Sequence, residues 1–351
     1  MIPLSSTLHK ESFPGQLADA LVEVAKNIQK NGLVEPGGKK YIIPREIVCV
    51  LGSPWHQTQT ITASVEQKES FLVTDAVMDN LLAQIQEKKE KDEREGAEEM
   101  VTIEEMIIES SLNGYSTQSP IGKTARCISV AFLESSTFQA TEKLLRKALY
   151  EVFSPSIPLA FRSFTLASFS VVRDILSPHN DFLLIDVTGG TSNISVVHNS
   201  ILLDTANIPY GRNTLIQNIT KATGAIPEES LSRVKLFFAG GDDQELQELI
   251  GAEEERWLKH ITEACKRLSF EAVPLPSKVF VISDPVFGSW FKTVLESPEL
   301  AQFTVTKKHF EAILISEKSL EEKCSFERSV QKDVFLMTDA LFYSREYGAH
   351  Q

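Results

Sequence analysis

The residues best suited to chemistry lie between Asp181 and Val197, in the stretch DFLLIDVTGGTSNISVV. An apolar run ends in Asp186, and a polar turn, Thr188–Ser192, separates it from a second apolar run. Gly189 and Gly190 have no Cβ, so the backbone can turn tightly and present its N–H groups to an anion. The pattern predicts a β-hairpin that binds phosphate.

The side chains around this turn add further ligands. Thr191 and Ser192 supply hydroxyl donors, and Asp186 could hold a metal ion through water. No Gly-Lys-Ser/Thr sequence follows the turn, and the chain leaves it as a strand, so the motif is not a P-loop. An ordinary hairpin with glycines at positive φ is the alternative interpretation.

Other groupings of reactive side chains are weaker. The histidines at 56, 179, 198, 260 and 309 do not fall at metal-ligand spacings such as H-x-x-x-H. Asp186 and Asp204 could form a carboxylate pair if neighbouring strands bring them together. A metallohydrolase is therefore a third possibility, and His56, after Gly52-Ser53-Pro54, is expected to be a packed or hydrogen-bonded loop residue.

Composition excludes several classes of protein. The chain has 351 residues, with 42% apolar and 24% charged side chains and a net charge of −13, which argues against a nucleic-acid-binding protein. Four widely spaced cysteines without a C-x-x-C pair suggest neither a zinc site nor a disulfide framework. No apolar stretch approaches the roughly 20 residues that span a bilayer, and the N-terminus does not read as a secretory signal. We expect a cytoplasmic protein without direct membrane insertion.

The hairpin is positioned by an alternation of helices and strands. Apolar residues at helical spacing predict helices at residues 16–30, 74–99, 138–153, 168–176, 214–222, 227–238, 243–268, 288–296 and 326–343. Apolar or alternating runs predict strands at residues 45–51, 58–65, 106–112, 125–133, 159–166, 181–187, 192–198, 200–208, 277–283, 304–308 and 311–315. Three strands joined by short turns, between 181 and 208, predict an antiparallel meander.

Three motifs in this order resemble the bacterial cell-division protein FtsA and its relative PilM, members of the actin-like ATPase superfamily. Ile185–Ile194 resembles the second phosphate-binding motif of that family, and Ile208–Asn213 resembles its Ile-Pro-x-Gly-Gly segment. Leu112–Tyr115 with Pro120–Lys123 resembles its Asn-Pro-Ile-Gly region, which in FtsA lies in an inserted subdomain. The resemblance covers the chain from about Arg45 to Tyr343.

The resemblance implies an α/β protein with the actin-like, ribonuclease-H-like ATPase fold and an FtsA-type inserted α/β subdomain. It divides the chain into a remnant of the first actin-like subdomain at 1–44, the inserted subdomain at 45–153, a return to the first subdomain at 154–180, and a second actin-like domain at 181–351. It implies ATP and Mg²⁺ as cofactors, with the metal held by Asp186 through water. The implied nucleotide-binding residues are Asp186, Thr188, Gly189, Gly190, Thr191, Ser192, Asn193 and Gly211.

Departures from the family pattern suggest that ATP binding is weakened or lost. The family begins with an Asp-x-Gly hairpin, the first phosphate motif, which this sequence lacks; the chain is either truncated at its N-terminus or has lost the motif. Thr188 replaces the usual first Gly, and Asn193 replaces the usual Asp. At the adenine the family has a Gly-Gly turn, whereas this chain has Asp284-Pro285, which offers fewer backbone donors.

The three motifs follow the family order but depart from the family pattern. Together these observations predict an FtsA- or PilM-like scaffold of bacterial cell division or pilus assembly, with vestigial or regulatory nucleotide binding. The implied partner is a tubulin-like division filament or the cytoplasmic tail of a membrane protein, which could recruit the chain to the inner face of the membrane. Self-association is possible by analogy with the family. An active actin-fold ATPase or a sugar-kinase-like phosphotransferase is the alternative.

Overall fold

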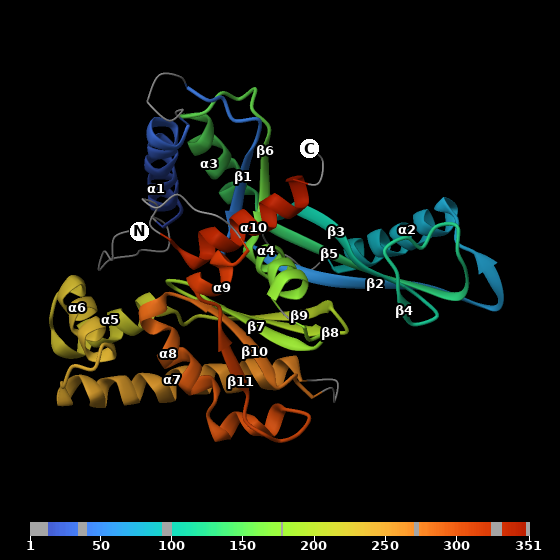
Figure 1. Ribbon diagram of the computed structural model, residues 1–351. Coiled ribbons are helices and arrows are strands. Elements are labelled where there is room, and N and C mark those ends of the chain that lie inside the picture. Colours follow the sequence, from blue (N-terminus) through green and yellow to red (C-terminus); the bar gives the residue numbers. More distant parts are fainter. Residues whose placement is uncertain are drawn as a thin grey trace.

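Within the described residues, which are 13–33, 41–92, 100–176, 178–269, 274–323 and 332–348, the computed structural model contains three β-sheets with helices packed around them. Figure 1 shows the five-stranded sheet in the lower half, the four-stranded sheet extending to the right, and the two-stranded sheet above. The hairpin turn of interest belongs to the five-stranded sheet.

The five-stranded sheet has the strand order β11-β10-β7-β8-β9. Its strands are β7 Phe182–Val187, β8 Ser192–His198, β9 Ile201–Ile208, β10 Lys278–Ser283 and β11 Glu311–Leu314. The first three form the predicted antiparallel meander, and β10 runs parallel to both β7 and β11. All six residues of β7 are buried, as expected for a strand that has helices on both faces.

Helices cover both faces of this sheet. Side chains such as Leu183 and Ile185 pack with one group of helices, while Phe182 and Leu184 pack with the other. The first group is α5 Arg212–Thr223, α6 Pro227–Phe238, α7 Gln244–Leu268 and α8 Pro285–Leu295, followed by a 3-10 helix at Pro298–Phe303. The second group is α4 Phe164–Val171, extended by a π-helical turn at Val172–Leu176, with α9 Glu317–Glu321 and α10 Val334–Gly348.

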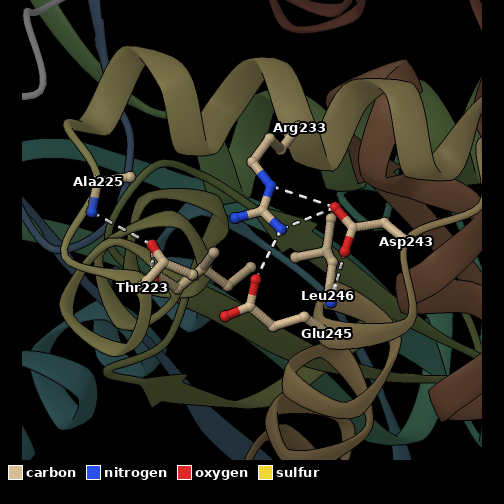
Figure 2. A network of polar contacts seen from close by, with 7 residues as sticks. Thr223, Ala225, Arg233, Asp243, Glu245 and Leu246 are labelled. Atoms are coloured by element: carbon tan, nitrogen blue, oxygen red, sulfur yellow. Dashed lines mark hydrogen bonds and ion pairs between the residues drawn. The ribbon is translucent and has the colours of Figure 1, made fainter.

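Arg233 joins two helices of the first group. Figure 2 shows its guanidinium reaching from α6 to Asp243 and Glu245 at the start of α7, with N–O distances of 2.8 and 3.0 Å. Asp243 also caps α7 by accepting a hydrogen bond from the Leu246 N–H, and Arg233 holds the pKa of the Asp243 carboxyl below its ordinary value. A carboxylate at this position satisfies a helix donor that has no partner within the helix.

The two-stranded sheet pairs β1 Ile47–Leu51 in parallel with β6 Leu159–Ser163. Helix α1 Phe13–Asn27, extended by a π-helical turn at Ile28–Gly32, packs with α3 Gln139–Tyr150 on one face of it. The boundaries expected from sequence placed β1 in residues 45–153 and β6 in residues 154–180. The pairing of β1 with β6 therefore joins strands from two of the expected subdomains. The boundaries of these subdomains remain a prediction.

The four-stranded sheet has the order β2-β5-β3-β4, and its pairs are antiparallel. Its strands are β2 Gln57–Leu72, β3 Met100–Leu112, β4 Tyr115–Ser116 and β5 Thr124–Phe138, with helix α2 at Asp75–Asp92. Asn113 and Gly114 have φ angles of 51° and 83°. They form the predicted turn between β3 and β4.

Three predicted elements differ from the structure or extend outside the described residues. The strand predicted at Thr304–Lys308 is wrong: Thr304 makes an isolated bridge to Leu275 after the 3-10 helix, and the strand of this region is β11. The helix predicted through the charged run ends at Asp92, and residues 93–99 lie outside the described part of the chain. The start of the helix predicted at 326–343 also lies outside it, and α10 begins at Val334.

The packing of the core can be tested by a substitution at Trp257. It is fully buried on α7, where its ring contacts Trp290 and Phe291 of α8. Trp257→Ala is expected to lower the free energy of unfolding by about 3–5 kcal/mol, because a large cavity would remain. Leu236→Ala, at a side chain that is 68% exposed, is the control and should cost less than about 0.5 kcal/mol. Chemical denaturation measures both, and equal costs would contradict this packing.

Candidate functional site

The hairpin turn between β7 and β8 is closed by hydrogen bonds between its own residues. The Thr188 N–H donates to the Thr191 carbonyl at 2.9 Å, and the Thr188 hydroxyl donates to the same oxygen at 3.0 Å. The strands below pair Asp186 with Asn193 and Val187 with Ser192. The turn is therefore a closed four-residue loop at the carboxyl end of β7, the edge of an α/β sheet where ligands commonly bind.

Helix α5 begins directly against this turn. The N–H groups of Arg212 and Asn213 donate to the carbonyls of Thr188 and Gly189, at 3.1 and 2.6 Å. A Cβ on Gly211 would come within 2.6–2.7 Å of three backbone atoms of the turn. Gly211 is therefore required by close packing, and two helix N–H groups that could bind an anion already have protein acceptors.

The loop after β1 lies on the other side of the turn. The Thr191 hydroxyl donates to the Ser53 carbonyl at 3.1 Å, and the Ser53 hydroxyl donates to Asn207 Oδ1 of β9 at 2.9 Å. Both threonine hydroxyls of the turn thus bond to protein groups. This contact joins the two-stranded sheet to the five-stranded sheet.

Asp186 is buried below the turn, with 2% of its surface exposed. Its Oδ2 accepts a hydrogen bond from Asn193 Nδ2 at 3.2 Å, while no described residue gives its Oδ1 a hydrogen bond. Burial raises the pKa of the Asp186 carboxyl to about 7, and the hydrogen bond from Asn193 lowers it by less. The carboxyl is consequently easier to protonate than a surface aspartate.

A chain of hydrogen bonds continues from Asn193 to the loop after β1. Asn193 Nδ2 donates to the Thr165 hydroxyl at 3.0 Å, and Thr165 Oγ1 lies 2.9 Å from His56 Nε2. Burial lowers the pKa of the His56 imidazole to about 4, so the ring is neutral at pH 7 and Nε2 can accept the Thr165 proton. All four side chains are buried. His56 is the packed, hydrogen-bonded residue that the sequence predicted.

Ser192 faces the core instead of the turn. Its hydroxyl donates to the Tyr210 carbonyl at 2.7 Å and accepts from Trp257 Nε1 at 3.4 Å. The Tyr210 hydroxyl in turn donates to the buried Glu253 at 2.7 Å. Ser192 therefore anchors β8 to α7 and has no free hydroxyl for a phosphate.

An ion pair crosses from α5 to α8. Arg212 Nη1 lies 2.8 Å from Asp284 Oδ2, and Asp284 Oδ1 accepts from the Val286 N–H as the N-cap of α8. Pro285 occupies the first turn of that helix, where its missing N–H costs nothing. The Asp284-Pro285 pair is thus the start of a helix.

The sequence assigned no site contact to Ser53, Thr165 or Arg212, and it marked Asp284 only as part of a departure at the adenine position. The arginine was visible as a departure, since it stands where the Ile-Pro-x-Gly-Gly segment has its second glycine. Ser53 and Thr165 carried no signal, because the Ser53–Thr191 and Thr165–His56 contacts each join residues more than 100 positions apart. The alternative of glycines at positive φ is wrong for Gly189 and Gly190, neither of which has a positive φ. A Cβ on Gly189 would instead lie 2.8 Å from Asn213 Nδ2.

Some anion-binding capacity remains at the turn. The N–H groups of Gly189 and Gly190 have no acceptor among the residues that the structure describes, and Gly190 is exposed. Nothing within 4 Å would meet a Cβ on Gly190. These donors could hold a phosphate oxygen.

A metal site is less well supported. No group of three or more His, Cys, Asp or Glu residues within the described ranges could hold a metal ion. Asp204 is exposed on β9 opposite Val196, two strands from Asp186, so the two carboxylates do not form a pair. Asp186 could meet a water-bound Mg²⁺ only if the residues that bury it moved.

Comparison with known structures identifies the fold. The chain is similar to a PilM–PilN type IV pilus biogenesis complex, with a TM-score of 0.59, 11% identity, and coverage of 92% of this chain and 84% of that one. It also matches the ethanolamine utilization protein EutJ from Carboxydothermus hydrogenoformans (TM-score 0.39, 17% identity, 59% and 62% coverage). A third match is MreB 5 of Spiroplasma citri bound to AMPPNP (0.38, 12%, 61% and 67%). The chain has the actin-like ATPase fold, as the resemblance implied.

No protein-family model and no curated protein matches the sequence. No helix in the described residues is long and apolar enough to cross a membrane.

The packing of Gly211 against the turn gives a first prediction for the site. Gly211→Ala is expected to lower the free energy of unfolding by about 3 kcal/mol or more, because its Cβ would overlap three backbone atoms. Gly190→Ala, where the same atom meets open space, is the matched control and should change stability by less than about 1 kcal/mol. Urea denaturation compares the two, and a well-tolerated Gly211→Ala would rule out this contact.

Asp186 gives a prediction about pH. Its pKa is about 7 in the folded protein and 3.8 as its ordinary value, so between these values the folded state binds more protons than the unfolded chain. Stability from this group is fully present below about pH 4 and is lost as the pH rises toward 7. Asp186→Asn removes that loss, so its free energy of unfolding relative to wild type should rise by up to about 1.4 kcal/mol per pH unit.

Denaturation from pH 4 to pH 8 measures this difference. Asp204→Asn, at an exposed carboxylate, is the control and should run parallel to wild type. A flat difference between Asp186→Asn and wild type would mean that Asp186 ionises normally in the folded protein.

Proposed function

We propose that this chain is an FtsA- or PilM-like scaffold protein of bacterial cell division or pilus assembly, with ATP binding that is weakened or regulatory. The observation that carries the proposal is the state of the turn at Thr188–Thr191. Its hydroxyls bond to protein carbonyls, its own carbonyls cap α5, and the carboxyl of Asp186 is closed off from solvent. The groups that could bind a phosphate and its metal ion are therefore mainly engaged in hydrogen bonds within the protein.

Phosphoryl transfer needs several positioned groups at once. Here the N–H groups of Gly189 and Gly190 have no acceptor among the described residues, while Arg212 is paired with Asp284 across the same edge of the sheet. A nucleotide at this edge would have to compete with that ion pair. Binding that depends on opening this contact is weak, and it is well suited to regulation.

The scaffold role implies a protein partner. PilM is described in a complex with PilN, and we propose by analogy that this chain binds the cytoplasmic tail of a membrane protein or a tubulin-like division filament. Such a partner would place a cytoplasmic chain at the inner face of the membrane. Self-association belongs to the same proposal.

An active ATPase or a sugar-kinase-like phosphotransferase is the second candidate. Three groups favour it that have no partner within the described part of the chain: Asp186 Oδ1 and the N–H groups of Gly189 and Gly190. Together they could meet a hydrated metal and a phosphate. It requires the Asp186 carboxyl to become accessible.

Calorimetric titration with Mg-ATP separates the two candidates. The scaffold proposal expects a Kd of about 1 mM or weaker for wild type, with little change in Asp186→Ala or in the exposed control Asp204→Ala. A micromolar Kd that is lost in Asp186→Ala and in Gly190→Asp, but kept in Asp204→Ala, would overturn the proposal in favour of a live nucleotide site.

A further inference from the structure

The ion pair between Arg212 and Asp284 lies directly beside the hairpin turn. The backbone N–H of Arg212 bonds to the Thr188 carbonyl, and its guanidinium reaches Asp284 at the start of α8. The two side chains are 22% and 26% exposed, so solvent and small ions reach the pair. A partly exposed ion pair is only weakly stabilised, so its members can exchange partners.

Asp284 satisfies Arg212 incompletely. Its Oδ1 is already engaged, because it accepts from the Val286 N–H as the N-cap of α8, and Oδ2 receives the guanidinium. The other contacts of Arg212 are to Asn213 Oδ1, at 3.3 Å from both Nε and Nη2. A guanidinium has five N–H donors and binds oxyanions best through two short parallel bonds. Asp284 therefore uses only part of the donor capacity of Arg212.

The pair between Arg233 and Asp243 in Figure 2 shows how an arginine is held firmly in the same setting. Asp243 is also a helix N-cap, but Arg233 bonds to its Oδ2 through both Nε and Nη2, at 3.2 and 2.8 Å. Nη2 of Arg233 reaches Glu245 as well, at 3.0 Å. Two carboxylates thus hold Arg233, whereas Asp284 is the one carboxylate that pairs with Arg212 among the described residues.

The turn supplies further donors close to this guanidinium. Gly190 is exposed, and the N–H groups of Gly189 and Gly190 have no acceptor among the residues that the structure describes. Asn213 connects the turn to Arg212: its Oδ1 accepts from the guanidinium, and its Nδ2 lies 2.8 Å from the position of a Cβ on Gly189. Backbone N–H groups and an arginine that converge in this way are typical of a site for phosphoryl oxygens.

We propose that Arg212 is the cationic residue of an oxyanion site at this turn and that Asp284 is its built-in competitor. The N–H groups of Gly189 and Gly190 and the guanidinium bind a phosphoryl group together, and Arg212 leaves Asp284 as the ligand arrives. Asp284 stays the N-cap of α8, so the exchange opens the contact between α5 and α8 without uncapping the helix. This inference rests on the proposed function and names the contact that regulates its weakened phosphate site.

Calorimetric titration of the full chain with sodium pyrophosphate, without Mg²⁺ and at constant ionic strength, tests the exchange. Asp284→Asn should bind about fivefold more tightly than wild type, because it removes the competing charge while asparagine keeps the N-cap. Asp243→Asn makes the same change at the N-cap of α7 beside Arg233 and should leave the affinity unchanged. Urea unfolding curves check that each variant folds.

The dependence on Arg212 separates exchange from simple charge repulsion. Arg212→Gln should weaken pyrophosphate binding, and adding Asp284→Asn to it should give no gain. A gain that persists without Arg212 would mean that Asp284 acts only by repelling anions, and it would overturn the proposal. An equal gain in Asp243→Asn would do the same. So would equal affinity of wild type and Asp284→Asn, or no binding to Asp284→Asn up to about 10 mM pyrophosphate.

Inorganic phosphate and Mg-ATP distinguish the sources of the phosphoryl group. The fivefold gain with Mg-ATP would assign the site to the phosphate chain of a nucleotide, and a gain with pyrophosphate or phosphate alone would assign it to a free anion. Either result supports the exchange.

The pyrophosphate result can be separated from the test of the scaffold proposal. Micromolar Mg-ATP affinity in wild type that Asp186→Ala abolishes, together with the gain in Asp284→Asn, would reject the weakened nucleotide site and keep the exchange. Weak Mg-ATP affinity without a gain in Asp284→Asn would do the reverse.

Discussion

Three buried hydrogen bonds link His56, Thr165, Asn193 and Asp186, and the geometry of the hairpin depends on them. Their residues come from the loop after β1, from α4, from β8 and from β7. Because a buried polar group without a partner costs free energy, each member fixes the position of the next. The chain of bonds therefore sets how the two-stranded and five-stranded sheets meet below the turn.

The identity of residue 193 decides the character of this site. The amide nitrogen of Asn193 donates to Asp186 on one side and to Thr165 on the other. An ionised aspartate at this position could donate neither bond and would place a second carboxylate beside Asp186. An asparagine at this position thus makes a structural link where an aspartate would make a pair of acidic groups, and Thr191 extends the link to Ser53.

The sequence predicts local features well and long-range contacts poorly. The meander from β7 to β9, the long helix α7, the buried Trp257 and the Asn113-Gly114 turn follow from periodicity, length and turn chemistry, all of which lie within a few residues. The pairing of β1 with β6 spans more than 100 residues and leaves no periodic signal. The predicted strand at Thr304–Lys308 fails because a short apolar run also suits a loop that follows a 3-10 helix.

For the site, the sequence identifies the turn but not its surroundings. Gly211 and the turn residues are where the motif places them, yet the burial of Asp186 and the bonds to Ser53 and Thr165 arise from segments that the motif does not contain. Whether a phosphate motif is open or filled depends on those segments. Motif matching alone therefore leaves nucleotide binding undecided.

A double-mutant cycle between Thr165 and Asn193 tests most directly whether the buried chain of bonds holds the two sheets together. The free energy of unfolding of wild type, Thr165→Val, Asn193→Ala and the double variant would be measured at pH 7. A coupling of about 1 kcal/mol or more is expected, because each side chain loses its partner in the single variants. Effects that add within about 0.3 kcal/mol would contradict the account.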